Sequence, residues 1–261
     1  GDGVNDAPAL KSADIGCVMG IQGSDIAKSS GDLILTDDNF TTIVSAVKEG
    51  RGVYNNIKRV TVLLLGTNYC ESLTIILSLL LFKICPLISI QLLWINLVTD
   101  SLPAIALGLK KYDNELMQEK PKTRDKKSIF NKNMIIQLLA VGATLVIVSL
   151  IGFNLAINLT GNEIVARTVV FAILGFGEIM QAFNLQSNKS IFKSKIKNNK
   201  LFYLLNFISI ALMLLILLVP PLTNLFMLGT LTPTLWIYVI GASLLPIIIS
   251  EILKLLKIGK I

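Results

Sequence analysis

Residues 88–108 read ISIQLLWINLVTDSLPAIALG, and this stretch decides how the rest of the chain is interpreted. It is long and apolar enough for a helix that crosses a bilayer, for which about 20 residues are needed. It also carries Asn96, Thr99 and Asp100, whose spacings of three and four place them on one helix face. A carboxylate in mid-bilayer costs on the order of 3 kcal/mol even on lenient insertion scales. Asp100 therefore indicates a functional site within a membrane.

Pro103 adds to this prediction because it lacks an N–H group. The carbonyl of Thr99, four residues earlier, then loses its helix partner. A broken helix inside a membrane is tolerated where its freed groups line a cavity or contact a ligand. Taken alone, Pro103 could be no more than a kink. Beside Asn96 and Asp100 it predicts an oxygen-rich site.

Five further apolar stretches have the length of a membrane-spanning helix. Together with the first they predict six spans, with approximate limits 60–82, 88–108, 134–158, 164–186, 201–219 and 234–253. The chain of 261 residues is 53% hydrophobic with a mean hydropathy of +0.69, which is too apolar for an ordinary soluble domain. The expected fold class is a mainly α membrane protein, with residues 57–261 as its six-helix transmembrane domain.

Basic residues alternate between the connections of these spans. They gather before the first span, between the second and third, between the fourth and fifth, and in the tail: Lys48, Arg51, Lys58 and Arg59; Lys110, Lys111, Lys120, Lys122, Arg124, Lys126 and Lys127; Lys189, Lys193, Lys195, Lys197 and Lys200; Lys254, Lys257 and Lys260. Apart from Lys83, the other connections are nearly free of Lys and Arg. The positive-inside rule then predicts that both chain ends are cytoplasmic. It explains the net charge of +7 better than nucleic-acid binding does.

Residues 1–56 are mixed in character and suit part of an α/β domain that is too short to bury a good core alone. The expected elements are strands within 13–19 and 32–35 and a helix over 39–50. Asp37 or Asp38 could cap the start of that helix. The same helix is expected to continue through 52–59 into the first span.

The chain opens with Gly1-Asp2-Gly3-Val4-Asn5-Asp6-Ala7-Pro8-Ala9-Leu10-Lys11. Two acids four residues apart, flanked by glycine and asparagine, suit a loop that holds Mg²⁺ beside a phosphate, because Mg²⁺ takes carboxylate, water and phosphate oxygens. Glycine lets the backbone approach the phosphate closely. A turn without any ligand would fit the short motif as well.

Two further acids lie within predicted spans. Glu71 follows Asn68 by three residues in the first span, and Glu178 lies in the fourth. Carboxylates, amide oxygens and a freed carbonyl suit Ca²⁺, which takes six to eight oxygens in flexible geometry. Soft metals would favour Cys and His, but His is absent and Cys70 is better explained as a packing residue. Asn68 and Asn96 could also be hydrogen-bonding groups between helices.

The opening motif resembles the phosphorylation-domain signature of P-type ATPases, which have a haloacid-dehalogenase-like fold. The resemblance covers the whole chain, because that family follows the motif with a stalk helix and membrane spans. It implies that Asp2 and Asp6 bind or orient Mg²⁺ and that Asn5 contacts the phosphorylated site. The DKTGT motif with the nucleophilic aspartate does not occur here. We therefore expect a fragment of a longer, ATP-using protein, with no catalytic residue of its own and no ATP hydrolysis alone.

The intramembrane pattern resembles the sarco/endoplasmic-reticulum type of calcium pump, in a form we expect to be bacterial. The resemblance rests on Asn-x-x-Glu in the first span and on Leu92-Leu93-Trp94-Ile95-Asn96-Leu97-Val98-Thr99-Asp100 in the second. It implies one Ca²⁺ site with ligands from Asn68, Glu71, Thr99, Asp100 and Glu178, and a second site that uses Asn96 and Asp100. The second site would also need groups from a span that precedes this sequence.

Other interpretations remain open at this stage. The same acids could serve a P-type pump for Na⁺, H⁺ or Mn²⁺, a secondary transporter with a proton relay, or a non-catalytic membrane subunit. The expected partners are the lipid bilayer of a cell membrane and the preceding part of the same pump, with no nucleic acid and no obligatory subunit. Release of the ion would leave three acids facing one another, so proton uptake is expected.

Overall fold

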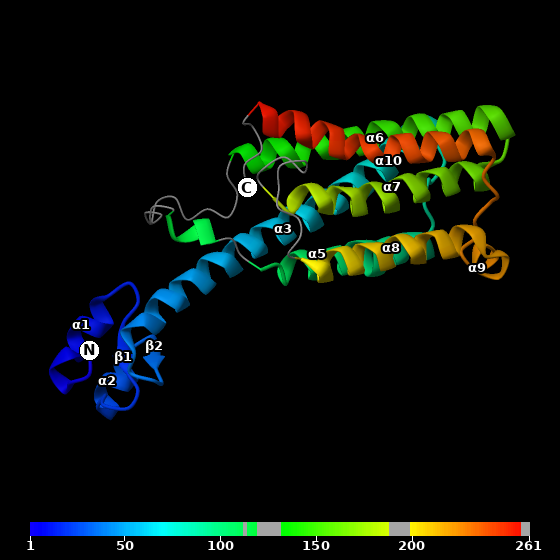
Figure 1. Ribbon diagram of the computed structural model, residues 1–261. Coiled ribbons are helices and arrows are strands. Elements are labelled where there is room, and N and C mark those ends of the chain that lie inside the picture. Colours follow the sequence, from blue (N-terminus) through cyan, green and yellow to red (C-terminus); the bar gives the residue numbers. More distant parts are fainter. Residues whose placement is uncertain (112–113, 119–131, 188–198, 257–261) are drawn as a thin grey trace. The chain divides into compact units, whose positions relative to one another are not determined.

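The computed structural model describes residues 1–111, 114–118, 132–187 and 199–256 (Figure 1). The chain divides into two compact units. One comprises Gly1–Val53 together with Asn114–Gln118, and the other comprises Tyr54–Lys111 and the described residues from 132 onward. Most residues of the basic connections predicted above, from Lys120 to Lys127 and from Lys189 to Lys197, lie outside the described residues.

The first unit contains a small parallel sheet. Strand β1 (Cys17–Met19) pairs with β2 (Leu33–Leu35) in the register Cys17 to Leu33, and helix α2 (Asp25–Ser30) makes the crossover that parallel strands require. Both strands lie within the predicted stretches, so that prediction is confirmed. The unit also holds the short helices η1 (Val4–Asp6), α1 (Ala7–Ser12) and η3 (Asn114–Gln118), which were not anticipated. Its core is small, with Leu10, Val18 and Ala27 at its centre.

Helix α3 (Phe40–Phe82) is one continuous helix of 43 residues. It joins the predicted 39–50 helix to the predicted first span, as expected. The predicted cap was wrong, because the capping oxygen is Oδ1 of Asn39, which accepts from the backbone N–H of Thr41 at 3.0 Å. Asp37 instead accepts from the hydroxyl of Thr42. Asp38 accepts from the backbone N–H groups of Ile21 and Gln22, in the loop that follows β1.

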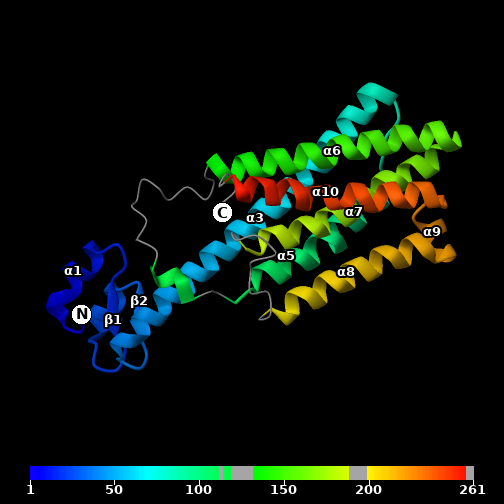
Figure 2. The same cartoon turned by 45° about the horizontal axis from the view of Figure 1, so that its top comes forward.

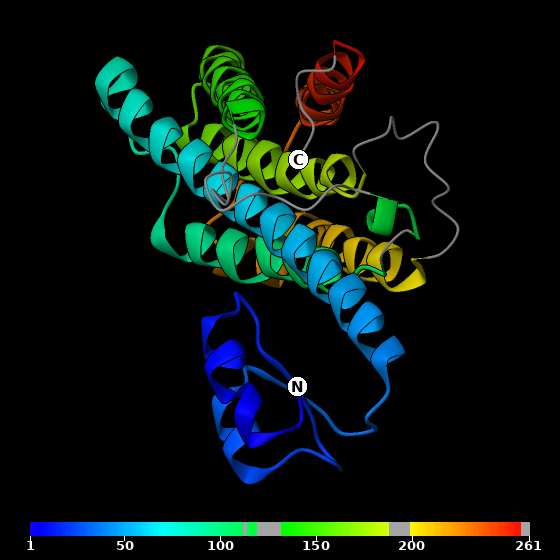
Figure 3. The same ribbon diagram turned by 90° about the vertical axis from the view of Figure 1, so that its left-hand side faces the viewer.

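The second unit is a helical bundle. Its further helices are α4 (Ser89–Trp94), the π-helical η2 (Ile95–Asp100), α5 (Ser101–Gly108), α6 (Lys132–Thr160), α7 (Glu163–Leu185), α8 (Lys200–Leu218), α9 (Pro220–Leu225) and α10 (Pro233–Leu255). Helices α6 and α10 lie together on one side of α7, while α5 and α8 lie on its other side (Figures 2 and 3).

Helix α7 forms the centre of the bundle, since 17 of its 23 residues are buried. Phe171, Ile173 and Leu174 belong to its fully buried positions. Small residues let neighbouring helices approach closely, as is common in membranes. At Gly142 of α6, for example, an added Cβ would lie 2.8 Å from the ring of Tyr69.

Five helical segments in the described part of the chain are long and apolar enough to cross a membrane. They are α3, the Ser89–Gly108 segment, α6, α8 and α10. Each matches a predicted span within a few residues, apart from the N-terminal extension of α3 from Phe40 to residue 59. The predicted span 164–186 corresponds to α7, which is not among the five, so a count of six crossings stays a prediction.

Candidate functional site

The centre of the site is the π-helical turn η2, which separates α4 from α5. It spans Ile95–Asp100 and ends three residues before Pro103. The predicted break in the helix is not seen, because residues 89–108 are helical throughout; the irregularity is a π-helical widening, in which the hydroxyl of Ser101 donates to the carbonyl of Asn96 at 3.0 Å. Single π turns of this kind are frequent at functional sites.

Three carboxylates from three helices are buried beside this turn. Glu71 of α3 is 4% exposed, and Asp100 of η2 and Glu178 of α7 are each 1% exposed. Coulombic interactions connect each of the three with the other two. The structure therefore gathers the three acids that the sequence predicted to act together.

Asp100 has one engaged and one unengaged oxygen. Its Oδ2 accepts a hydrogen bond from Thr67 Oγ1 of α3 at 2.5 Å, while no N–H or hydroxyl group of the described residues donates to Oδ1. Sequence reasoning missed Thr67, which is fully buried. The available signal was its position next to Asn68 and one turn before Glu71.

Glu71 is held by the side chain of Asn96. The Nδ2 group of Asn96 donates to both carboxylate oxygens, at 3.1 and 2.9 Å, and to the carbonyl of Leu92 at 3.0 Å. These bonds join α3 to the π turn across the site. They leave the amide oxygen of Asn96 available as an acceptor or a ligand.

Glu178 is the least satisfied of the three acids. No N–H or hydroxyl group of the described residues donates to its carboxylate oxygens, which face the carboxyl group of Asp100 within hydrogen-bonding range, and the amide oxygen of Gln181, one turn later, has no donor either. Gly66 of α3 allows a close approach here, since an added Cβ would lie 3.2 Å from Nε2 of Gln181. Buried polar groups of this kind are costly unless a ligand, an ion or a proton satisfies them.

The remaining predicted ligands differ in their surroundings. Thr99 is fully buried, and its hydroxyl bonds back to the carbonyl of Ile95 at 2.7 Å. Asn68 is exposed and donates to the carbonyl of Leu64 at 2.7 Å, so it takes no part in the hydrogen bonds of the acid cluster. In the described part of the chain, no three acidic, thiol or imidazole side chains are already arranged as a metal site.

The predicted phosphate loop lies in the first unit. Oδ2 of Asp6 accepts from the backbone N–H groups of Asp2 and Gly3 at 2.9 and 3.0 Å. These hydrogen bonds hold the pKa of Asp6 below its ordinary value of 3.8. The side chains of Asp2 and Asn5 belong to exposed residues.

The donor set of this loop fits Mg²⁺. Asp2 and Asp6 supply hard carboxylate oxygens from one short turn, and Mg²⁺ is commonly held by one or two carboxylates plus water and substrate phosphate. One oxygen of Asp6 fixes the loop, which leaves Asp2 as the more accessible ligand.

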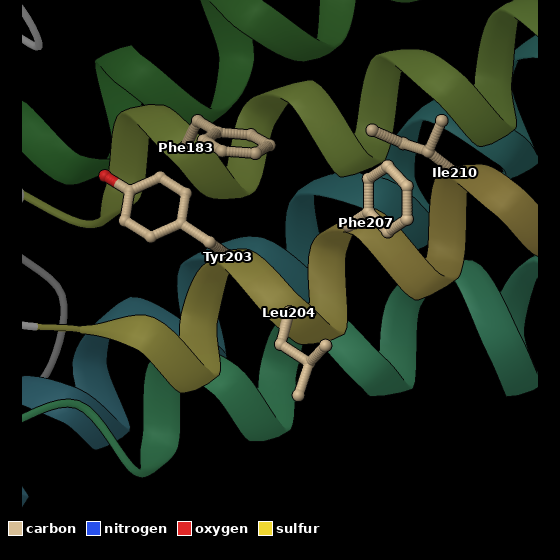
Figure 4. A pocket seen from close by; sticks show the side chains of 5 residues that line it. All are labelled: Phe183, Tyr203, Leu204, Phe207 and Ile210. Carbon is tan, nitrogen blue, oxygen red and sulfur yellow. The ribbon is translucent and has the colours of Figure 1, made fainter.

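A separate hollow lies between α7 and α8. It has a volume of about 430 Å³ and is lined by Phe183, Tyr203, Leu204, Phe207 and Ile210 (Figure 4). Its lining is almost wholly apolar and includes no acid. It is therefore not part of the carboxylate cluster.

The sequence was compared with models of known protein families. The family described as "Cation transporting ATPase, C-terminus" matches residues 84–256, a range that contains Asp100 and Glu178. This chain belongs to the cation-transporting ATPase family.

Relatives extend the match over nearly the whole chain. It is 40% identical over 98% of its length to calcium-transporting ATPase 1 of Bacillus cereus, and 39% identical over 94% to the calcium-transporting ATPase of Bacillus subtilis. It is 37% identical over 97% to the human calcium-transporting ATPase type 2C member 1. The resemblance inferred from the sequence is thereby confirmed.

The chain spans less than a third of the length of these relatives, namely 31% and 28% of the two Bacillus proteins. It corresponds to their C-terminal part. Its apolar helices make it a multi-pass membrane protein. The acid cluster lies on helices of this C-terminal region.

Proposed function

We propose that this chain is the C-terminal part of an ATP-driven calcium pump and that its acid cluster binds the transported Ca²⁺. The observation that carries the proposal is the convergence of the buried Glu71, Asp100 and Glu178 from three helices, with no N–H or hydroxyl donor among the described residues for either oxygen of Glu178. Such acids within membrane helices are retained for function. The names of the relatives support Ca²⁺ as the ion.

The proposed ligands supply the oxygens that a calcium ion needs. Glu71, Asp100 and Glu178 contribute charge, and the list of ligands is completed by Asn68, Asn96 and Thr99. Ca²⁺ accepts six to eight oxygens in flexible geometry, so a cluster that tightens on binding suits it. Before binding, Asn96 and Thr67 hold two of the carboxylates in place.

The loop at the start of the chain serves the phosphorylation step in this proposal. Asp2 and Asp6 hold Mg²⁺, and Asn5 contacts the phosphate of an aspartyl-phosphate intermediate. The aspartate that accepts the phosphoryl group from ATP lies in a part of the pump not contained in this sequence. When bound, Mg²⁺ offsets negative charge during phosphoryl transfer.

The proposal includes six membrane crossings with α7 among them. An even number places both chain ends on the same side, which the basic connections identify as the cytoplasmic side. The fold of residues 1–56 as part of a haloacid-dehalogenase-like domain belongs to the same proposal.

The test compares two acids of the same helix in the complete pump. Glu178→Gln should abolish Ca²⁺-dependent phosphoenzyme formation from ATP. Glu163→Gln, at the exposed start of α7 beside Arg167, should leave it unchanged. The paired variant Glu71→Gln with Asp100→Asn should behave like Glu178→Gln. Normal calcium uptake by these variants would end the proposal.

A pump for another hard cation is the second candidate, because the same oxygens can hold Na⁺, H⁺ or Mn²⁺. Measuring phosphoenzyme formation with each cation separately identifies the one that drives it. A secondary transporter would need no phosphorylation loop. Asp2→Asn should abolish transport in a P-type pump and leave it intact in a secondary transporter.

A further inference from the structure

Helix α5, which directly follows Asp100, and helix α7, which carries Glu178, end close together. Helix α5 ends at Gly108, about 12 Å along its axis from Asp100, and α7 ends at Leu185, about 10 Å beyond Glu178. The last carbonyls of a helix have no partner within the helix, so they need donors from elsewhere.

The donor for α5 comes from α3. Nδ2 of Asn56 donates to the carbonyls of Gly108 at 3.0 Å and Lys110 at 2.8 Å. Its Oδ1 accepts from the guanidinium of Arg59 at 3.4 Å. Asn56 is 3% exposed, so this saturated amide lies in the interior of the packing between α3 and the end of α5.

The donor for α7 comes from the segment that Asn56 holds. Nζ of Lys110 donates to the carbonyl of Gln186, directly after α7. A second donor holds the same end of α7 from the other side, since Nζ of Lys254 in α10 donates to the carbonyl of Asn184 at 2.9 Å. Side-chain bonds therefore run from α3 to the end of α5 and on to the end of α7.

We propose that Asn56 is a positioning residue that couples movement of α3 to the helices bearing Asp100 and Glu178. The inference rests on the proposed function, since what Asn56 positions is the cation site. From Asn56 to Glu71, α3 is unbroken over about 22 Å. A shift of α3 then moves Glu71 directly, and through Asn56 it moves the ends of the two partner helices in the same step.

The physical basis is the number of bonds that one amide makes. Asn56→Asp preserves size but replaces the NH₂ group by an oxygen that faces two carbonyl oxygens; the ionised carboxylate donates to neither, and a protonated one could donate to one at most. The variant therefore loses the hydrogen bonds from Asn56 to Gly108 and Lys110 without leaving a cavity. Asn55→Asp makes the same chemical change one residue away on the same helix, where no bond to α5 is present in the described structure.

The experiment measures the cation concentration for half-maximal phosphoenzyme formation from ATP in the complete pump. Asn56→Asp should raise it by about 2- to 30-fold relative to Asn55→Asp, the range expected for coupling positions remote from a ligand. Phosphorylation by inorganic phosphate without the cation should stay normal, because it needs only a folded protein and an intact phosphorylation site.

A second variant tests the link to α7. Lys110→Met should also raise the cation concentration for half-maximal phosphoenzyme formation. Combined with Asn56→Asp it should add less than its separate effect, because the two residues act through one chain of bonds. If the effects of Asn56→Asp and Lys110→Met were fully additive, the two residues would not act through one series of hydrogen bonds from α3 to α7.

Two outcomes separate the coupling from the function it rests on. Equal cation responses in Asn56→Asp and Asn55→Asp, or a loss of folded protein alone, would overturn the coupling. A wild-type pump driven by a cation other than Ca²⁺ would overturn the calcium assignment, and the comparison made with that cation would still decide the coupling.

Discussion

Single residues define what the acid cluster can do, through the oxygens that are engaged and those that are not. Asn96 holds Glu71 from the π turn, and Thr67 holds Asp100 from α3. No N–H or hydroxyl group of the described residues donates to one oxygen of Asp100 or to either oxygen of Glu178. In the proposed function these oxygens are the cation ligands, and the oxygens bonded to Asn96 and Thr67 fix their geometry.

Thr67→Val should therefore weaken cation binding although Thr67 is not a predicted ligand. The hydroxyl fixes Oδ2 of Asp100, and removing such a partner of a metal ligand typically costs roughly 10- to 100-fold in affinity. The measurement is the cation dependence of phosphoenzyme formation. Thr61→Val is the matched control, because the hydroxyl of Thr61 bonds only to its own helix at Ile57. Equal behaviour of the two variants would contradict the prediction.

Asp38 gives a pH-dependent prediction outside the membrane. It accepts from the backbone N–H groups of Ile21 and Gln22, which holds its pKa below the ordinary 3.8. Because the folded pKa is the lower one, the stabilisation is present above about pH 4 and is lost as the pH falls through the lowered pKa. Amide exchange at residues 21–22, corrected for intrinsic rates, should accelerate in that range.

Asp38→Asn should remove this acid dependence and raise exchange at neutral pH. The backbone of residue 38 has a φ of 50°, which Asn tolerates as well as Asp, so the variant changes the acceptor and not the turn. Asp25→Asn, on α2, should leave residues 21–22 unaffected. Acid-dependent exchange that persists in Asp38→Asn would assign the effect to another group.

The acids could be predicted from the sequence because a carboxylate within an apolar span is costly wherever it points. The contacts of Thr67 and Asn56 could not. Their partners lie 33 and 52 residues away, and the position of Thr67 one turn before Glu71 indicates a helix face but not its partner Asp100. Their roles depend on which helices become neighbours, and single-sequence periodicity does not contain that information.

Among helices and turns, too, some features can be predicted from the sequence and others depend on the folded bundle. The limits of the spans follow from apolar length, and an irregularity near Pro103 follows from its missing N–H. The irregularity is a π-helical stretch over Ile95–Asp100 within a continuous helix and not the predicted break, because this depends on how the carbonyls are satisfied in the folded bundle. The short helix α9 has too few residues to produce a periodic signal.

Pro103→Ala should make the protein more stable and the site weaker. Alanine restores the N–H that a regular helix needs, and Pro within a helix costs about 3 kcal/mol. A regular turn would withdraw the freed carbonyl and re-aim Asp100, so we expect about a tenfold loss of cation affinity alongside a higher melting temperature. Thermal unfolding and cation-dependent phosphorylation measure the two effects.

Pro246→Ala supplies the comparison. Pro246 also lies inside a helix, α10, and its carbonyl accepts from Asn184 at 3.3 Å. It is remote in sequence from the π turn and belongs to a helix without a predicted ligand. The variant should raise the melting temperature and leave cation affinity unchanged. A loss of affinity equal to that of Pro103→Ala would show that helix stiffness alone matters.

At the scale of the whole molecule, the number of membrane crossings depends on whether α7 spans the bilayer. Helix α7 is about 35 Å long, enough for a hydrocarbon core of about 30 Å. Its neighbours α6, α8 and α10 present apolar surfaces, whereas α7 is enclosed by them. An enclosed helix can hold Glu178, Gln181 and Asn184 because protein and not lipid surrounds it.

If α7 crosses, Asn162 before it and Lys200 after the following connection lie on opposite sides of the membrane. We expect Asn162→Cys to react with an impermeant thiol reagent from outside intact cells. Lys200→Cys should react only after permeabilisation, as should Lys132→Cys at the start of α6, because six crossings place these two positions on one side. The labelling uses a complete protein without other reactive cysteines. Outside labelling of Lys200→Cys would mean that α7 turns back within the membrane, and Glu178 would then reach the acid cluster on a re-entrant helix.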